Sequence, residues 1–371
     1  MIARTRFLGG SAATLAALAL PRNARAAAHD GGEGGDAWRP YVVTTTVRLP
    51  AKRTAKLWLP IAGISSQTWI QPLTNEWRTN APVSQIRTDA ATGTPMLAAE
   101  WTPKDPQPVL QGTCVVELLD RTVSFGTASA APRLDDAARA AYTAGTPAVP
   151  TDGIVRRTAE RIVGNATTPL ARARALYEWV AANTTWAPSV RGCGTGDVRA
   201  MLQSGNPSGK SADLNGLFVA LARAAGLPAR TLAGLRVAPS RYGFASLGVD
   251  AMTVTDAQDC RAEVWIDGTG WVPADPAGVR AAAAEEARDG RRANAAKLET
   301  VRSALFGTSE TNWIAFNDGR DVRLPGSAGP AVPFLMYPQA EVDGARLDCL
   351  APEEFSYTIE ARRWIEPGLP A

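Results

Sequence analysis

Histidine and cysteine, the side chains that most often carry nucleophilic or metal chemistry near neutral pH, are scarce in this sequence. Among 371 residues there are one histidine, His29, and four cysteines, Cys114, Cys193, Cys260 and Cys349. A Ser-His-Asp or Cys-His hydrolase needs an imidazole to accept and return a proton, and a histidine zinc site needs two or three imidazoles. His29 lies close to the N-terminus, and the cysteines form no C-x-x-C pair. The sequence therefore predicts neither kind of site, and no bound metal or other cofactor.

Three segments in the second half of the chain carry a family resemblance. They read GKSADLNGLFVALARAAGLPAR at 209–230, AQDCRAEVW at 257–265 and GWVPADP at 270–276, and GCGTGD precedes them at 192–197. Together they resemble the transglutaminase-like superfamily, a papain-related cysteine fold, and in particular its bacterial exported branch. The resemblance covers about residues 155–280.

The resemblance implies a catalytic triad whose residues this chain has changed. In that family a cysteine at the N-terminus of a buried helix is the nucleophile, a histidine on an adjacent strand moves the proton, and an aspartate on the next strand orients the histidine. The reaction is amide cleavage or transfer of the acyl group to an amine. The matching positions here are Ser211, Asp259 and Asp275, so only the orienting acid is retained.

These replacements predict a degenerate catalytic centre. A serine hydroxyl needs a base, and an unperturbed aspartate, with a pKa of ~3.9, is a poor one. We expect Ser211 to cap the helix and Asp259 to be a satisfied polar group at a cleft. Three alternatives stay open: a catalytic Ser211, a cation held between Asp259 and Asp275, and a reactive Cys193 in the cleft.

The residues around these positions have simpler interpretations. Cys260 follows Asp259 on a predicted strand, so its side chain should point to the opposite face and pack as a small hydrophobe. Arg230 and Arg261 are expected to pair with acids such as Glu263.

Helix and strand patterns surround the motifs. Apolar residues at i, i+3, i+4, i+7 and i+11 from Leu214 predict a helix that ends before Gly226-Leu227-Pro228. Strand-like runs follow at 229–237 and 260–266. Helices followed by strands indicate an α+β fold, and the resemblance specifies a transglutaminase-like, papain-type core in which a helix packs on an antiparallel sheet.

The first part of the chain is rich in alternating apolar residues and turn signals, which predicts an N-terminal β-rich domain at 38–130. Its core is expected to contain Trp58, Trp69, Trp77 and Trp101, with a sugar-binding aromatic face as the alternative. The other predicted divisions are a linker at 131–153, the transglutaminase-like core at 154–280, a polar helical segment at 281–300 and a C-terminal β-rich extension at 301–371.

The N-terminus has the features of an export signal. Arg4 and Arg6 precede an apolar run at 7–20, and Ala24-Arg25-Ala26 is typical of a cleavage site. We therefore expect a signal peptide at 1–26, a flexible leader at 27–37, and a periplasmic or secreted protein with no stable membrane span. The segment Arg4-Thr5-Arg6 resembles a twin-arginine motif in which threonine replaces the second arginine.

Charge and motifs limit the partners. Removal of residues 1–26 leaves 35 Lys plus Arg against 36 Asp plus Glu, so the positive formal charge belongs to the signal, and no basic stripe indicates nucleic acid. The sequence favours an exported, non-catalytic module that binds a peptide, a cell-wall amide or a protein; its oligomeric state is left open. One alternative is an active amide hydrolase or acyltransferase that uses Ser211 or another nucleophile, and another is a purely structural envelope module.

Overall fold

The computed structural model describes residues 37–125, 133–288 and 294–364. The predicted signal peptide, most of the predicted leader and His29 lie outside the described residues. The described residues from Trp38 onward form one compact unit. Within the described ranges, no helix is long and apolar enough to cross a bilayer.

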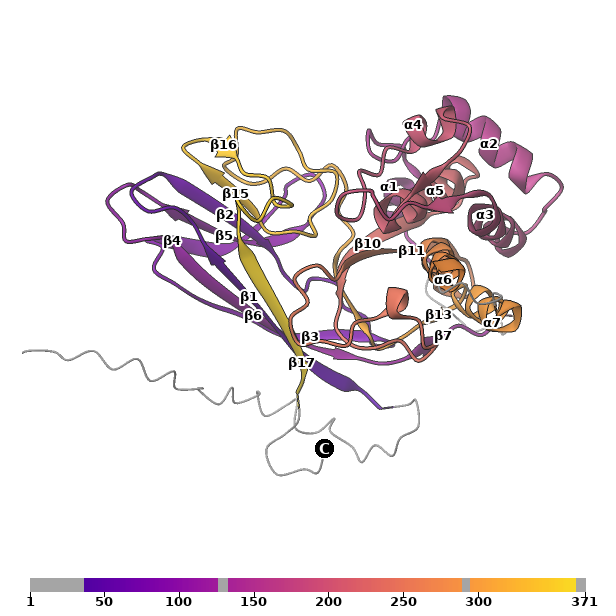
Figure 1. Cartoon of the computed structure of the whole chain (residues 1–371). Helices are drawn as coiled ribbons and strands as arrows, with labels where there is room; N and C mark the ends of the chain where they lie inside the picture. Colours follow the sequence, from indigo (N-terminus) through magenta and orange to yellow (C-terminus); the bar gives the residue numbers. More distant parts are fainter. Residues whose placement is uncertain (1–36, 126–132, 289–293, 365–371) are drawn as a thin grey trace, which may run out of the picture. The chain divides into compact units, whose positions relative to one another are not determined.

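Two antiparallel sheets dominate the N-terminal region (Figure 1). One has the strand order β17-β1-β6-β3 and the other has the order β16-β15-β2-β5-β4. Their strands are β1 (Arg39–Arg48), β2 (Ala55–Pro60), β3 (Ile70–Thr79), β4 (Val83–Thr88), β5 (Pro95–Trp101), β6 (Val109–Leu118), β15 (Gln339–Val342), β16 (Ala345–Arg346) and β17 (Tyr357–Arg363). The β-rich N-terminal region that the sequence predicts is therefore confirmed.

Tryptophan side chains fill the interior of this region, as expected. Trp58, Trp69 and Trp101 are buried, and Trp77 is half-buried and packs against the same core as Trp101. The Trp77 indole donates a hydrogen bond to Ser84. Because the indoles face inward, they do not form the exposed aromatic surface that a sugar-binding face requires.

The second half of the chain builds an antiparallel sheet covered by helices. The sheet order is β12-β11-β10-β14, and helix α5 packs against β10 and β11. Its strands are β10 (Ala229–Arg236), β11 (Gln258–Ile266), β12 (Gly270–Ala274) and β14 (Trp313–Asn317). The helices are α1 (Asp136–Thr143), α2 (Gly153–Val163), α3 (Pro169–Asn183), α4 (Val198–Gln203), α5 (Ser211–Ala224), α6 (Pro276–Arg288) and α7 (Ala295–Ala304). Short strand pairs complete the inventory: β7 (Arg121–Thr122) with β13 (Thr308–Ser309), and β8 (Thr185–Trp186) with β9 (Ser208–Gly209).

Helix α5 is the central element of this half. Its residues from Ser211 to Arg223 are all buried, since α2, α3 and α6 contact it on the sides away from the sheet. A helix enclosed in this way needs apolar residues around most of its circumference, and Leu214, Leu217 and Phe218 are each fully buried. The helix ends as the sequence predicts: Gly226 follows with φ +79°, a conformation that glycine adopts without strain.

The last part of the chain is shared between the sheets. β14 extends the helix-covered sheet by pairing with β10, whereas β15 pairs with β2 and β17 pairs with β1 (Figure 1). The polar segment around residue 290 is flanked by α6 and α7, and the interval between the two predicted domains contains α1.

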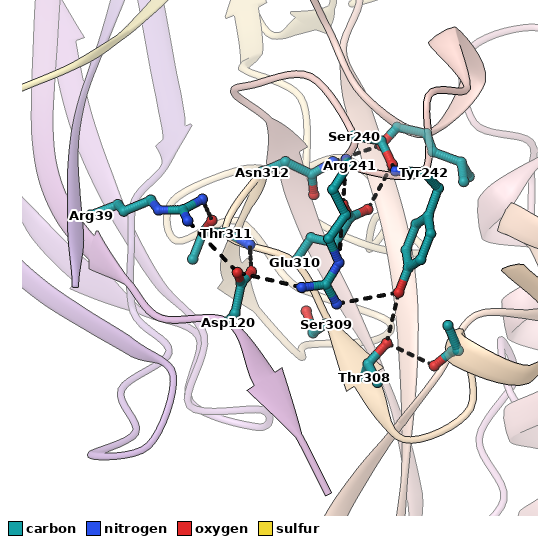
Figure 2. A network of polar contacts seen from close by, with 12 residues as sticks. Arg39, Asp120, Ser240, Arg241, Tyr242, Thr308, Ser309, Glu310, Thr311 and Asn312 are labelled. Atoms are coloured by element: carbon teal, nitrogen blue, oxygen red, sulfur yellow. Dashed lines mark hydrogen bonds and ion pairs between the residues drawn. The ribbon is translucent and has the colours of Figure 1, made fainter. Parts of the chain in front are cut away.

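A polar network connects the start of β1 with the loop that precedes β14 (Figure 2). Arg39 donates to the Thr311 hydroxyl at 2.7 Å, and the Thr311 amide donates to Asp120 at 2.8 Å. Glu310 accepts a hydrogen bond of 2.7 Å from the Arg241 amide and one of 2.8 Å from the Ser240 hydroxyl. This network ties the N-terminal sheet to the loop that feeds the helix-covered sheet.

Candidate functional site

A cavity of about 360 Å³ opens at the N-terminal end of α5. Ser211 and Asp259 both line it, together with Cys193, Lys210 and Arg236. Its opposite wall belongs to the segment 349–357, just before β17. The structure therefore brings two of the three predicted site residues to one cavity; Asp275 is buried beside it, under α5.

Ser211 is the first residue of α5 rather than its cap. Lys210 holds the capping position, and its amide donates to the Asp213 carboxylate at 2.9 Å. Because the Asp213 carboxylate accepts the hydrogen bond from the capping residue, the Ser211 side chain does not cap the helix. Instead, its Oγ accepts a hydrogen bond of 3.2 Å from the amide of Cys260 on β11. The expectation that Ser211 caps the helix is therefore wrong by one position.

Asp213 also fixes the glycine-rich loop beside the cavity, a role that the sequence analysis missed. Its Oδ1 accepts hydrogen bonds from the amides of Thr195 (3.0 Å) and Gly196 (2.8 Å). A Cβ on Gly194 would lie 1.8 Å from the carboxylate, so only glycine fits this close approach. An acidic residue at the third helical position was the available signal, because it is half of a capping box.

Asp259 is held by arginine side chains. It is 2% exposed, and its Oδ1 lies 3.0 Å from Arg236 Nη2 while its Oδ2 lies 3.6 Å from Arg261 Nε. Among the described residues, Asp259 Oδ2 has no hydrogen-bond partner. The next residue, Cys260, is 1% exposed and packs in an apolar cluster, as the strand alternation predicts.

Asp275 has a complete set of partners. Its Oδ1 accepts hydrogen bonds of 2.9 Å from Asn215 Nδ2 and from the Gly278 amide. Burial and the nearby negative charge of Asp259 raise the pKa of Asp275, although Arg261 and these hydrogen bonds oppose the shift. Asn215 is the second residue that the sequence analysis missed; its placement one turn into α5, on the face toward β12, was the signal.

Cys193 has an unreactive environment. It is 7% exposed, and its Sγ donates to the Gln258 carbonyl at 3.0 Å. Burial raises the pKa of the thiol to about 11, despite opposing hydrogen bonds from Tyr337 and Ser211. Cys193 and the other three cysteines are free thiols in the structure.

The two arginines of the motifs have different partners. Arg230 pairs with Glu263 at 2.7 Å and with Asp318 at 3.0 Å, and its guanidinium stacks over Trp271, which confirms the structural role predicted for it. Arg261 forms no ion pair with Glu263. It lies against Asp259, which is two residues earlier on the same face of β11, and it donates to Asn312 at 3.1 Å.

Comparison with known proteins identifies a domain within the chain. Residues 156–276 match the sequence profile of the transglutaminase-like superfamily. This segment is a transglutaminase-like domain. The match covers α5, β10, β11 and β12, and hence all three candidate residues of the transglutaminase-like domain.

Other proteins are similar to this chain in sequence or in structure. An uncharacterized protein of Haemophilus influenzae is 37% identical over 231 residues, which are 60% of this chain and 62% of that relative. The structure described as that of a candidate cysteine protease from Cytophaga hutchinsonii superposes with a TM-score of 0.53 and 12% identity, over 90% of this chain and 93% of that one. The periplasmic domain of TgpA from Pseudomonas aeruginosa matches with 17% identity and a TM-score of 0.33, over 72% of this chain and 93% of that one.

Proposed function

We propose that this transglutaminase-like protein is a non-catalytic binding module whose cleft holds a peptide, a cell-wall amide or a protein segment. The observation that carries the proposal is the state of Asp259, which occupies the position of the family's proton-transferring histidine. It is ion-paired with Arg236 and lies against Arg261. A carboxylate committed to two guanidinium groups cannot shuttle a proton as an imidazole does.

The nucleophile position supports the same conclusion. Ser211 Oγ accepts a hydrogen bond of 3.2 Å from the backbone amide of Cys260. Activation of a serine requires the reverse arrangement, in which the hydroxyl donates to a base. The helix dipole of α5 stabilises an anion at this point by up to ~2 kcal/mol, which is far too little to ionise an alcohol.

The thiol in the cleft does not replace the lost nucleophile. A reactive cysteine has a depressed pKa and partial exposure, whereas the Cys193 thiol is buried and its pKa is raised to about 11. A cation between the two carboxylates is also disfavoured, since Arg236 and Arg261 already supply positive charge beside Asp259.

Activity assays test the proposal. Amine incorporation into a glutamine peptide, and hydrolysis of a chromogenic peptide amide, should match a buffer blank with and without iodoacetamide. An alkylation-sensitive rate would contradict the proposal and indicate Cys193 as nucleophile. A rate that resists alkylation but disappears in Ser211→Ala would establish the alternative, an active serine amidase or acyltransferase.

Export of the protein belongs to the same proposal. The support is the arrangement of Arg4, Arg6, the apolar run and Ala24-Arg25-Ala26. We expect the mature chain to start near Ala27 and to be recovered from the periplasm or the medium. Its intact mass, measured by mass spectrometry, should equal that of the chain without the signal peptide. Recovery of the uncleaved chain from the cytoplasm would contradict export, and inactivation of the twin-arginine translocase would decide the route.

A further inference from the structure

The cleft at the head of α5 has hydrogen-bond donors that the described residues leave unsatisfied. Arg236 lines the cleft with its side chain 14% exposed, and its Nε has no hydrogen-bond partner among those residues. Gln258, only 7% exposed, also lines it, and its Nε2 likewise has none. A buried donor without a partner is unfavourable, because it has lost its hydrogen bonds to water. Two of them at one cleft indicate a ligand that supplies acceptor oxygens.

The charges around the cleft favour an anionic acceptor. The carboxylate of Asp259 is opposed by two guanidinium groups, those of Arg236 and Arg261, so this trio has an excess positive charge. Lys210 adds a second positive charge at the N-terminus of α5, where the helix dipole also favours anions. The exposed side chain of Asp256, on the cleft wall, offsets one of these two charges.

Apolar side chains also line the cavity. They include Leu350, Pro352, Phe355 and Trp186. A ligand that fills the cavity must therefore combine a charged acceptor with an adjacent apolar group. This combination is ordinary in peptides and is absent from a bare inorganic anion.

We propose that the cleft binds a carboxylate of a peptide, next to an apolar side chain, with Arg236 and Lys210 as its charged partners. The Nη2 atom of Arg236 already pairs with Asp259, so the remaining donors of its guanidinium bind the carboxylate, and Lys210 contributes a point charge. The inference rests on the proposed function, because it names the chemical class of the ligand for the same cleft. The carboxylate is either a C-terminus or an acidic side chain.

Calorimetric titration of the full chain with three peptides separates these possibilities. The probes are acetyl-Gly-Leu as the free acid, its neutral C-terminal amide, and acetyl-Glu-Leu amide. We expect one or both acidic peptides to bind at least about tenfold more tightly than the neutral amide, with an affinity that falls as salt rises. The acid that binds better identifies the source of the carboxylate.

Variants locate the charge that matters. Lys210→Gln should remove most of the preference for the acidic peptide. Arg236→Lys keeps the positive charge but loses the guanidinium donors, so it should remove part of that preference. The matched control is Arg191→Gln: Arg191 also lines the cleft, but it is 60% exposed and already paired with Asp348 at 2.8 Å. Its loss should change the affinity less than about twofold.

Two results would overturn the inference. Equal binding of acidic and neutral peptides would leave a peptide-binding cleft without carboxylate selectivity, and absence of binding by all three at millimolar concentration would remove the ligand class altogether. Turnover in the activity assays is a different result, since it would overturn the proposed non-catalytic function whatever the binding preference.

Discussion

The two ends of the Ser211–Asp259–Asp275 array differ in how completely their polar groups are paired. At the Asp275 end, Asn215 is fully buried, donates to Asp275 and to the Cys260 carbonyl at 2.7 Å, and accepts from the Ala277 amide at 3.2 Å. At the cleft end, Asp259 Oδ2 and Arg236 Nε have no hydrogen-bond partner among the described residues.

The difference separates what holds the fold from what faces a ligand. The Asp275 end joins α5, β11 and the start of α6, so unpaired groups there would weaken the packing of the whole domain. The cleft end contacts a cavity, where unpaired donors can be satisfied by a bound molecule. The Asp275 end is thus part of the packed framework of the domain, whereas the Asp259 end lies beside a cavity.

Removing the hydrogen bonds at the Asp275 end should have the largest effect on stability. Asn215→Leu removes three hydrogen bonds from a fully buried position and leaves Asp275, the Cys260 carbonyl and the Ala277 amide short of partners. We expect a loss of about 3 kcal/mol or more in the free energy of unfolding, measured by urea denaturation.

Gln258→Leu is the matched control for that substitution, since it replaces a buried amide side chain whose Nε2 has no partner. Its free energy of unfolding should stay within about 1 kcal/mol of the wild type. If the two variants lose similar free energies of unfolding, the hydrogen bonds at the Asp275 end contribute no more to stability than the unpaired groups at the cleft end.

The next prediction concerns the cleft end, where the nucleophile and base of the family can be introduced. Ser211→Cys places a thiol at the N-terminus of α5, and Asp259→His adds a base that Asp275 could orient. Either change alone should do little, because nucleophile and base act together. In the double variant, the pH at which alkylation of the new thiol accelerates should be about one unit or more below that of Ser211→Cys.

The measurement is the iodoacetamide rate against pH, with the native cysteines assigned by mass spectrometry. Coincident curves near the unperturbed thiol value of ~8.5 would mean that position 259 does not face position 211. The assignment of the triad positions would then be wrong.

The smallest expected effect is the pH dependence of stability contributed by Asp275. Its pKa is raised in the folded state, chiefly by burial, so the folded protein holds this proton more tightly than the unfolded chain. Its stabilising contribution is complete below the unfolded pKa and declines as pH rises through the folded pKa. Asp275→Asn keeps an acceptor for the Gly278 amide and cannot ionise.

The stability of Asp275→Asn relative to the wild type should therefore increase with pH above about the normal aspartate range and then level off. Thermal melts of both proteins between pH 4 and pH 8 give this difference. A difference that is constant across the range, or that decreases with pH, would contradict the raised pKa.

Local patterns in the sequence predicted the elements of this protein well. The apolar spacing from Leu214 and the stop at Gly226 defined α5, since a buried helix must show both signals. The motif residues placed Ser211, Asp259 and Asp275 in one region, and strand alternation placed Cys260 on the opposite face from Asp259. Alternating apolar residues and turn signals also predicted the β-rich N-terminal region.

Long-range contacts were decided only by the tertiary structure. Asp259 is paired with Arg236, 23 positions away on β10, and the β15 and β17 strands join sheets begun nearly 300 residues earlier. No local pattern encodes these pairings, because they depend on which strands become neighbours in the sheets. The sequence by itself placed Ser211, Asp259 and Asp275 in the transglutaminase-like segment; the fold determined that the Asp259 carboxylate is held by arginines at the wall of a cleft.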